Sequence, residues 1–120
     1  MAILTFERFA EVLDEVIGRI PPRYLRGLTG GFNLQDGKKR EGGYLILGEY
    51  IESGMLGSFI MFYYGSFVDL LRGEPVESWE AEITETVLHE LQHHLESMAG
   101  RDDLAREEME ELARALQKEK

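Results

Sequence analysis

The 120-residue chain contains no cysteine. Without thiols, a disulfide framework, a thiolate zinc site and a cysteine nucleophile are all excluded. No stretch approaches the roughly 18 consecutive apolar residues of a membrane-spanning helix. The first residues, MAILTFERFAEVLDEV, have no basic region ahead of their apolar residues and do not resemble a secretory signal. These absences make the cytoplasm the expected location and argue against a membrane partner.

Basic residues are also scarce, since 13 lysines and arginines face 23 acidic residues, for a formal net charge of −10. A nucleic-acid-binding surface needs a concentration of basic side chains that displaces counterions. The only dense basic run, Lys38-Lys39-Arg40, lies between Gly37 and Gly42 and is expected to be a solvated loop. The charge balance therefore argues against nucleic acid as a partner.

The hydrophobic pattern predicts one α+β domain over residues 1–120. Helical periodicity predicts an N-terminal helix at Thr5–Ile20, with Thr5 as its N-cap and Pro21-Pro22 beyond its end. The same periodicity predicts a long helix from about Ser78 to Ala99, closed by Gly100, and a final helix from Asp103 to Gln117.

The segment between the first and the long helix is rich in β-forming residues and is punctuated by glycines. It predicts a small sheet of about three strands and two short helical segments. The expected strands are Phe32–Gln35, Tyr44–Ile51 and Ser58–Tyr64, and the short helical segments are Arg23–Leu28 and Gly65–Leu71.

The long predicted helix contains His89-Glu90-Leu91-Gln92-His93, which fits the pattern H-E-x-x-H. Residues four apart lie one turn apart on the same face, so His89 and His93 can direct two imidazoles at one zinc ion. Glu90 follows the first ligand directly, where it can take a proton from a zinc-bound water and pass it to a leaving amine. The alternative interpretation is that the two histidines belong to an ordinary polar surface.

Two features favour the metal site over the polar surface. All three histidines fall between positions 89 and 94, inside a convincing helix. His89 and His93 also lie nearly opposite an apolar stripe on the helical wheel. His94 lies near the edge of that stripe and is expected to be structural or to support the site indirectly, and Glu96 is expected to be solvated or to support the site indirectly. The stripe comprises Ile83, Val87, Leu91, Leu95 and Met98.

The third zinc ligand is less determined by the pattern. A catalytic zinc usually has three protein ligands and a water, and without a cysteine or a fourth histidine the third must be Asp or Glu. Asp103 lies in the turn after the long helix, where it has an alternative role as N-cap of the final helix. An antiparallel final helix would instead bring Glu107, Glu108 or Glu111 level with the histidines, and both possibilities stay open.

The segment VLHELQHHLESMAGRDDL resembles the small bacterial zincin-like metallopeptidases called mini-zincins, and FERFAEVLDEVIGRIPP and YLILGEY extend the resemblance more loosely. The resemblance implies a minimal zincin fold, with His89 and His93 as zinc ligands and Glu90 as general base. Many members resemble HExxHxxGxxD, but here Glu96 and Ala99 replace the glycine and the aspartate. The G-x-x-D spacing recurs at residues 100–103, which points to Asp103 as third ligand.

The expected function is therefore zinc-dependent hydrolysis of a peptide or protein substrate. A sheet edge at Ser58–Tyr64 could hold an extended peptide by strand addition, and Tyr63 or Tyr64 could donate to the oxyanion, although strand packing is their more ordinary role. The alternative is a catalytically inactive metal-binding or interaction module of the same fold. A homodimer is an assembly that the sequence leaves open.

Overall fold

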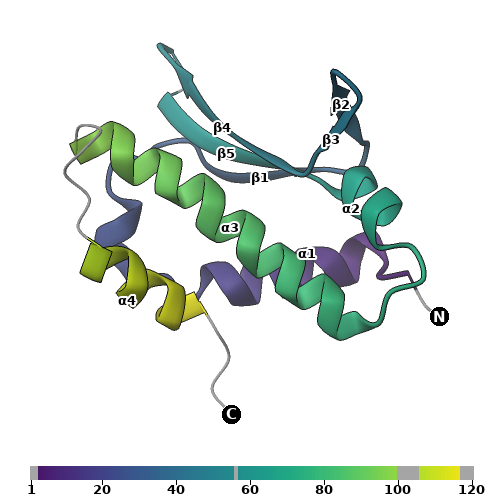
Figure 1. The fold of residues 1–120 in the computed structure, drawn as a ribbon. Helices are drawn as coiled ribbons and strands as arrows, with labels where there is room; N and C mark the ends of the chain where they lie inside the picture. Colours follow the sequence, from purple (N-terminus) through teal and green to yellow (C-terminus); the bar gives the residue numbers. More distant parts are fainter. Residues whose placement is uncertain (1–2, 56, 100–105, 117–120) are drawn as a thin grey trace.

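The computed structural model describes residues 3–55, 57–99 and 106–116, and it is an α+β domain, as the sequence predicts (Figure 1). None of the helices among these residues is both long and apolar enough to cross a bilayer. The helices are α1 (Phe6–Ile17), a 3-10 turn η1 (Pro22–Leu25), α2 (Tyr64–Leu71), α3 (Val76–Ala99) and α4 (Arg106–Leu116). The strands are β1 (Gly31–Gln35), β2 (Lys39–Glu41), β3 (Tyr44–Ile46), β4 (Gly48–Ser53) and β5 (Gly57–Tyr63).

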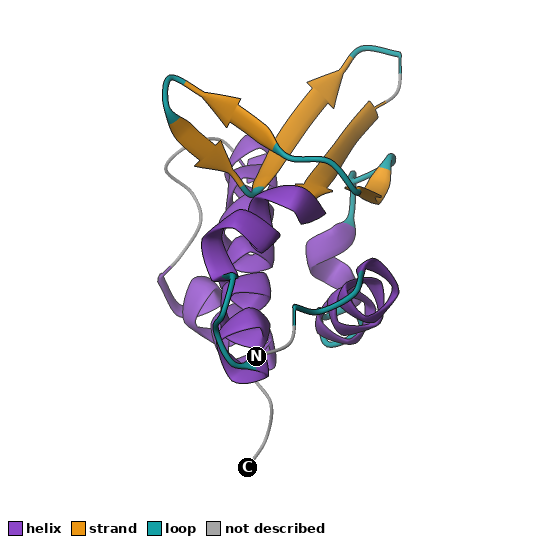
Figure 2. Ribbon diagram, turned by 90° about the vertical axis from the view of Figure 1, so that its right-hand side faces the viewer, coloured by secondary structure: helices purple, strands orange, loops and turns teal. Residues whose placement is uncertain are grey.

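The main sheet has the order β1-β5-β4, with β1 parallel and β4 antiparallel to β5. It forms one layer and the helices α1, α3 and α4 form the other (Figure 2). Alternate residues of β5 turn toward the helices, so Ile60 and Phe62 are fully buried, and Phe32 of β1 stacks on Phe62. These side chains belong to the same hydrophobic core as buried aromatic residues of the helical layer, among them Phe9 and Trp79.

The prediction that Ser58–Tyr64 forms an edge for peptide binding is wrong. Most of that segment is β5, which pairs with β1 on one side and β4 on the other, so its backbone groups are already used. Tyr64 is the first residue of α2. Within the described residues β4 pairs only with β5, which makes β4 an edge strand.

Helix α1 begins and ends where its local sequence requires. The Thr5 side chain accepts a hydrogen bond from the Arg8 amide at 3.0 Å, which confirms the predicted N-cap. The helix ends at Ile17, three residues earlier than predicted, because Gly18 caps it and Pro21 restricts the residue before it. On its inner side α1 packs against α3.

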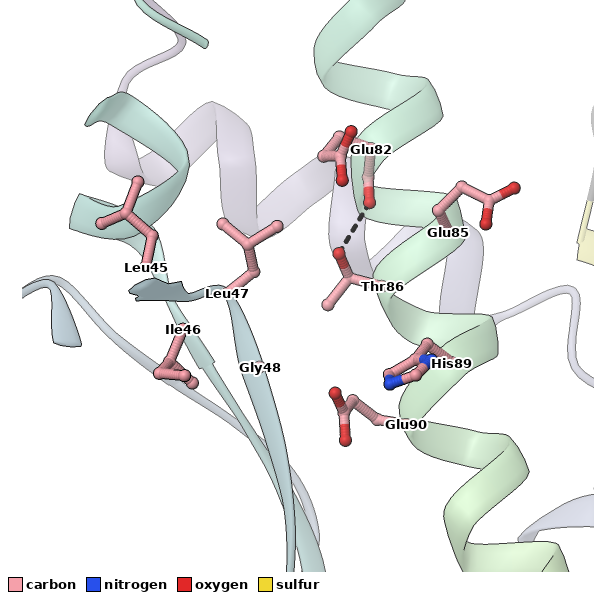
Figure 3. A pocket seen from close by; sticks show the side chains of 9 residues that line it. All are labelled: Leu45, Ile46, Leu47, Gly48, Glu82, Glu85, Thr86, His89 and Glu90. Carbon is pink, nitrogen blue, oxygen red and sulfur yellow. Dashed lines mark hydrogen bonds between the residues drawn. The ribbon is translucent and has the colours of Figure 1, made fainter. Parts of the chain in front are cut away.

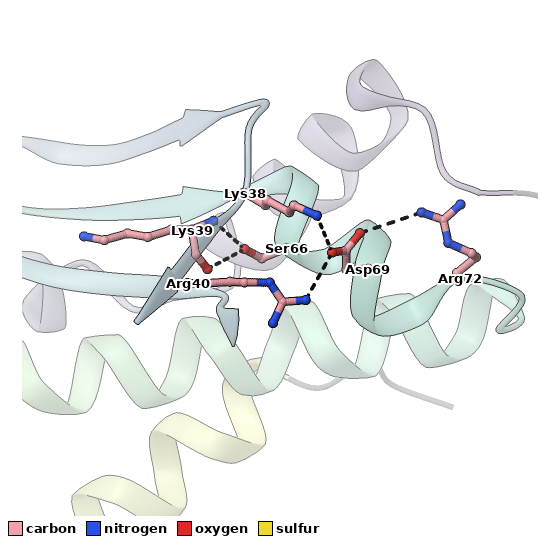
Figure 4. Close-up of polar contacts among 6 residues, drawn as sticks. All are labelled: Lys38, Lys39, Arg40, Ser66, Asp69 and Arg72. Carbon is pink, nitrogen blue, oxygen red and sulfur yellow. Dashed lines mark hydrogen bonds and ion pairs between the residues drawn. The ribbon is translucent and has the colours of Figure 1, made fainter. Parts of the chain in front are cut away.

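The expectation that the basic run Lys38-Lys39-Arg40 forms a solvated loop is wrong. Lys39–Glu41 forms β2, which pairs with β3. The two-residue connection Gly42-Gly43 has positive φ at both positions, the requirement of a type I′ hairpin turn. Lys38, Arg40 and Arg72 all lie around the Asp69 carboxylate of α2 (Figure 4).

Ser66 of α2 also fastens the hairpin. Its hydroxyl accepts a hydrogen bond from the Lys39 amide at 3.0 Å and contacts the Lys39 carbonyl at 3.3 Å (Figure 4). The hairpin is therefore held against α2, and β3 leads directly through Leu47 into β4.

Substituting Gly65 should test how tightly α2 holds the hairpin. The Gly65 amide donates to the Gly37 carbonyl at 2.9 Å, and a Cβ at Gly65 would lie 2.8 Å from the carbonyl carbon of Gly37 and from the Lys38 nitrogen. We expect Gly65→Ala to destabilise the protein by about 1–3 kcal/mol, although alanine is the better helix former. Urea unfolding measures this difference.

Gly37→Ala is the matched control for that measurement. A Cβ at Gly37 would meet nothing within 4 Å. We expect its effect to stay within about 0.5 kcal/mol. Equal unfolding midpoints for Gly65→Ala and the unsubstituted protein would contradict the close contact.

Candidate metal centre and active site

His89 and His93 converge on the exposed face of α3. Their Nε2 atoms lie 3.3 Å apart and their rings meet edge to face at 4.7 Å between centroids. Two nitrogens that each bind a tetrahedral zinc ion at about 2.0–2.1 Å stand about 3.3–3.4 Å apart. The pair therefore has the separation that two ligands of one zinc ion require, which confirms the shared face expected from the i, i+4 spacing.

Glu90, unlike the two histidines, is buried, with 7% of its surface exposed. Burial raises the pKa of its carboxyl group from the usual 4.5 to about 7, and the negative charge of Glu49 adds to this effect. A hydrogen bond from the Tyr50 backbone on β4 acts in the opposite direction and favours the charged form. The carboxyl group can thus both take up and release a proton near neutral pH.

Gly48 allows β4 to lie close enough to α3 to cover Glu90. A Cβ at Gly48 would stand 3.0 Å from Cγ2 of Thr86 and 3.4 Å from Cγ of Glu90. Both of those side chains are buried beneath the strand. A larger residue at Gly48 would push β4 away from the helix and let water reach the glutamate.

His94 has a structural role, one of the two roles expected from its place near the edge of the apolar stripe. Its side chain is fully buried, its Nε2 lies 2.8 Å from the Arg26 carbonyl oxygen, and its Nδ1 lies 3.2 Å from the Tyr50 hydroxyl. Because the carbonyl can only accept, Nε2 carries a proton. The imidazole thereby links α3 to β4 and to the loop after η1, and it does not take part in the convergence of the other two histidines.

A pocket of about 380 Å³ opens beside the histidine face, between α3 and the chain segment that enters β4 (Figure 3). Glu90 and His89 line it, and the Glu90 carboxylate points toward the strand side. The Thr86 hydroxyl is used within the helix, where it donates to the Glu82 carbonyl at 2.8 Å. The remaining lining residues are Leu45, Ile46, Leu47, Gly48, Glu82 and Glu85.

In the described part of the chain no third candidate metal ligand lies beside the histidine pair. That part contains no group of three histidine, aspartate or glutamate side chains able to hold a metal ion, so neither Glu108 nor Glu111 joins the histidines. The Glu111 carboxylate instead accepts hydrogen bonds from Tyr24, at 2.7 Å, and from Arg23. Asp103 and the side chain of Glu107 lie outside the described residues.

The other side chains considered from the sequence have ordinary structural partners. The Tyr63 hydroxyl donates to Glu49 at 2.7 Å, and the Tyr64 hydroxyl donates to the Leu4 carbonyl, so neither tyrosine is directed at the histidines. Glu96 accepts a hydrogen bond from Gln92 at 3.1 Å. The apolar stripe of α3 is buried at Ile83, Val87 and Leu91, but Met98 is 57% exposed because the stripe runs past the end of the core.

Sequence reasoning missed the residues that shape the site around the motif. Glu82 and Thr86 precede Glu90 by eight and four residues, so the helical period could have placed them on the same face. No local signal marks the Tyr50 amide or the Leu45–Gly48 segment, because their position depends on how the sheet packs against α3.

This architecture, a HExxH helix beneath a small sheet with an edge strand over its glutamate, agrees with the comparisons with known proteins. Residues 21–115 match the model of the zincin-like metallopeptidases, and the chain belongs to that family. It is also similar to the solved structure of a conserved hypothetical protein from T. thermophilus, at 40% identity and a TM-score of 0.69. That match covers 82% of this chain and 100% of the other. No curated protein matches.

Burial of Glu90 should reduce the stability of the metal-free protein at neutral and alkaline pH. Because its folded-state pKa lies above the unfolded value, the destabilisation is absent below about pH 4.5 and develops fully as pH rises past 7. In the presence of a chelator, we expect Glu90→Gln to be more stable than the unsubstituted protein by about 2–3 kcal/mol at pH 8. This gain should shrink toward zero near pH 4.5, as measured by urea unfolding.

Glu77→Gln serves as the control, because it removes an exposed carboxylate from the same helix. It should show no comparable gain at pH 8. An equal stability of Glu90→Gln and the unsubstituted protein across this pH range would mean that the glutamate is not desolvated in solution.

Proposed function

We propose that this protein is a zinc-dependent peptidase that cuts peptide bonds with an activated water and Glu90 as general base. The observation that carries the proposal is the combination of a convergent histidine pair with a buried glutamate beside it. The Nε2 atoms of His89 and His93 stand at the separation of two zinc ligands, and Glu90 lines the adjoining pocket. Membership of the zincin-like family supports the same reaction class.

In the proposed reaction a bound zinc ion and the residues of the chain would have separate roles. A bound zinc would supply a Lewis acid that polarises the scissile carbonyl and lowers the pKa of a water. Glu90 would take the proton from the attacking water and then give it to the leaving amine. In the metal-free protein burial raises the pKa of Glu90 to about 7, so this carboxyl group exchanges a proton near neutral pH, as a general base that later acts as an acid must.

His89 and His93 would hold the ion, and a carboxylate would complete the three-ligand site. We assign that role to Asp103 on the sequence spacing, with Glu107 as the alternative. Asp and Glu are the only ligand types left to the chain, since it has no cysteine and its third histidine is buried against Arg26 and Tyr50.

The substrate would enter as an extended peptide along β4. As an edge strand, β4 has backbone groups that can pair with an added strand, and it passes directly over Glu90. The cytoplasmic location and a homodimer stay predictions.

A second function, a non-catalytic metal-binding or interaction module, is favoured by a different observation. Among the described residues only two candidate ligands converge, and two imidazoles alone would bind zinc without completing a catalytic site. The two functions differ in whether Glu90 transfers a proton during turnover. Comparing kcat between the unsubstituted protein and Glu90→Gln distinguishes them.

Metal analysis tests the first part of the proposal. We expect about one zinc ion per chain after growth in zinc-replete medium, and its loss in both His89→Ala and His93→Ala. Asp103→Asn should weaken zinc binding more than Glu107→Gln does. Zinc content should fall at acid pH, because the histidines bind only when neutral. An unchanged zinc content in both histidine variants would rule out the site.

Turnover tests the second part. A cleavage screen on a peptide library first identifies a substrate, and kcat is then compared between the unsubstituted protein and Glu90→Gln. Glutamine preserves size but cannot accept the proton, so we expect normal zinc content with kcat lowered by about 10²–10⁴-fold. Equal kcat values would disprove the general-base role. Zinc binding without cleavage of any library peptide would favour the non-catalytic module.

A further inference from the structure

The pocket beside Glu90 has two chemically different walls. Leu45 and Leu47 give the strand side an aliphatic wall, and Ile46 lies on the other face of that segment (Figure 3). Helix α3 supplies the acidic wall, where Glu82 faces the gap and Glu85 points away from the strand (Figure 3). The volume of about 380 Å³ lies within the range of small-ligand sites and exceeds what one short side chain fills. Because His89 and Glu90 line the same pocket, a group bound there lies next to the reacting bond.

The acidic wall has no internal counterion among the described residues. Glu82 and Glu85 form no ion pair there, whereas Glu49, Asp69 and Glu111 are each matched by lysine or arginine. Helix α3 carries six glutamates and neither lysine nor arginine. Glu82 is partly buried and faces the gap toward the strand, whereas Glu85 extends from the outer rim (Figure 3).

We propose that this pocket selects an arginine or lysine side chain next to the scissile bond. The proposal rests on the peptidase function above and defines its substrate class. The aliphatic stem of the basic side chain packs against Leu45 and Leu47, and its cationic head pairs with Glu82. An uncharged side chain would cover Glu82 without replacing its lost hydration, so the pocket disfavours it.

The length of the pocket suits a long side chain. Glu82 precedes His89 by seven residues, which corresponds to about 10 Å along the helix axis. An extended arginine places its guanidinium about 7 Å from its Cα, and a charge-assisted hydrogen bond adds about 3 Å. A basic residue whose Cα lies beside the histidine pair can therefore reach Glu82 with its charged group. A short polar side chain at the same position cannot.

Arginine and citrulline peptides test this proposal, because the two residues have nearly the same shape and differ in charge. Capped octapeptide pools, fixed at one position as arginine or citrulline and randomised elsewhere, are assayed for cleavage and for binding to the zinc-loaded protein. We expect the arginine pool to be preferred about tenfold in kcat/KM and in affinity. Glu82→Gln should bring both ratios near one, and Glu82→Asp should retain a preference for arginine.

Glu77→Gln is the matched control, since it removes the same charge from the same helix outside the pocket, and it should keep the tenfold ratio. Thermal melting and zinc content verify that the Glu82 variants fold. Cleavage without a preference for arginine overturns this inference and leaves the peptidase proposal standing. Arginine-selective binding without cleavage supports the pocket and counts against the peptidase. Failure of both pools to bind overturns the pocket assignment.

Discussion

The close contact between β4 and α3 is the constraint on which the site depends. Two strand residues span about 6.6 Å and four helix residues span about 6 Å, so alternate residues of β4 can meet successive turns of α3. Gly48 lies over Thr86 and Glu90, the Tyr50 hydroxyl contacts His94, and Glu52 accepts a hydrogen bond from Ser97. This seam both covers the glutamate and fixes the face that His89 and His93 present.

The seam explains how adjacent residues of one motif acquire opposite environments. His89 is exposed and Glu90 is buried, because one residue of helix rotates the side chain by about 100°, from the open surface to the underside of β4. His94 follows His93 in the same way and is fully buried. The HELQHH run therefore supplies two converging imidazoles, a desolvated acid and a structural link to the sheet from less than two turns of helix.

Features encoded locally were predictable from the sequence, and features that depend on packing were not. The N-cap at Thr5, the long helix and the common face of His89 and His93 all follow from helical spacing, and the structure has them. The hairpin of β2 and β3 was missed, although its Gly42-Gly43 turn carries a recognisable signal. The central position of β5 could not be read from its composition, because edge and central strands of a half-buried sheet use the same residues.

The environment of Glu90 bears on whether the protein acts on its ligand or only binds it. Glutamine at that position would accept the same hydrogen bond from the Tyr50 backbone, and it would avoid the desolvation that raises the pKa of Glu90 to about 7. The metal-free fold would thus be more stable with glutamine there. The stability of the metal-free fold does not account for the glutamate. Strongly shifted carboxyl groups beside a pocket are typical of catalytic sites, which supports the proposed proton transfer.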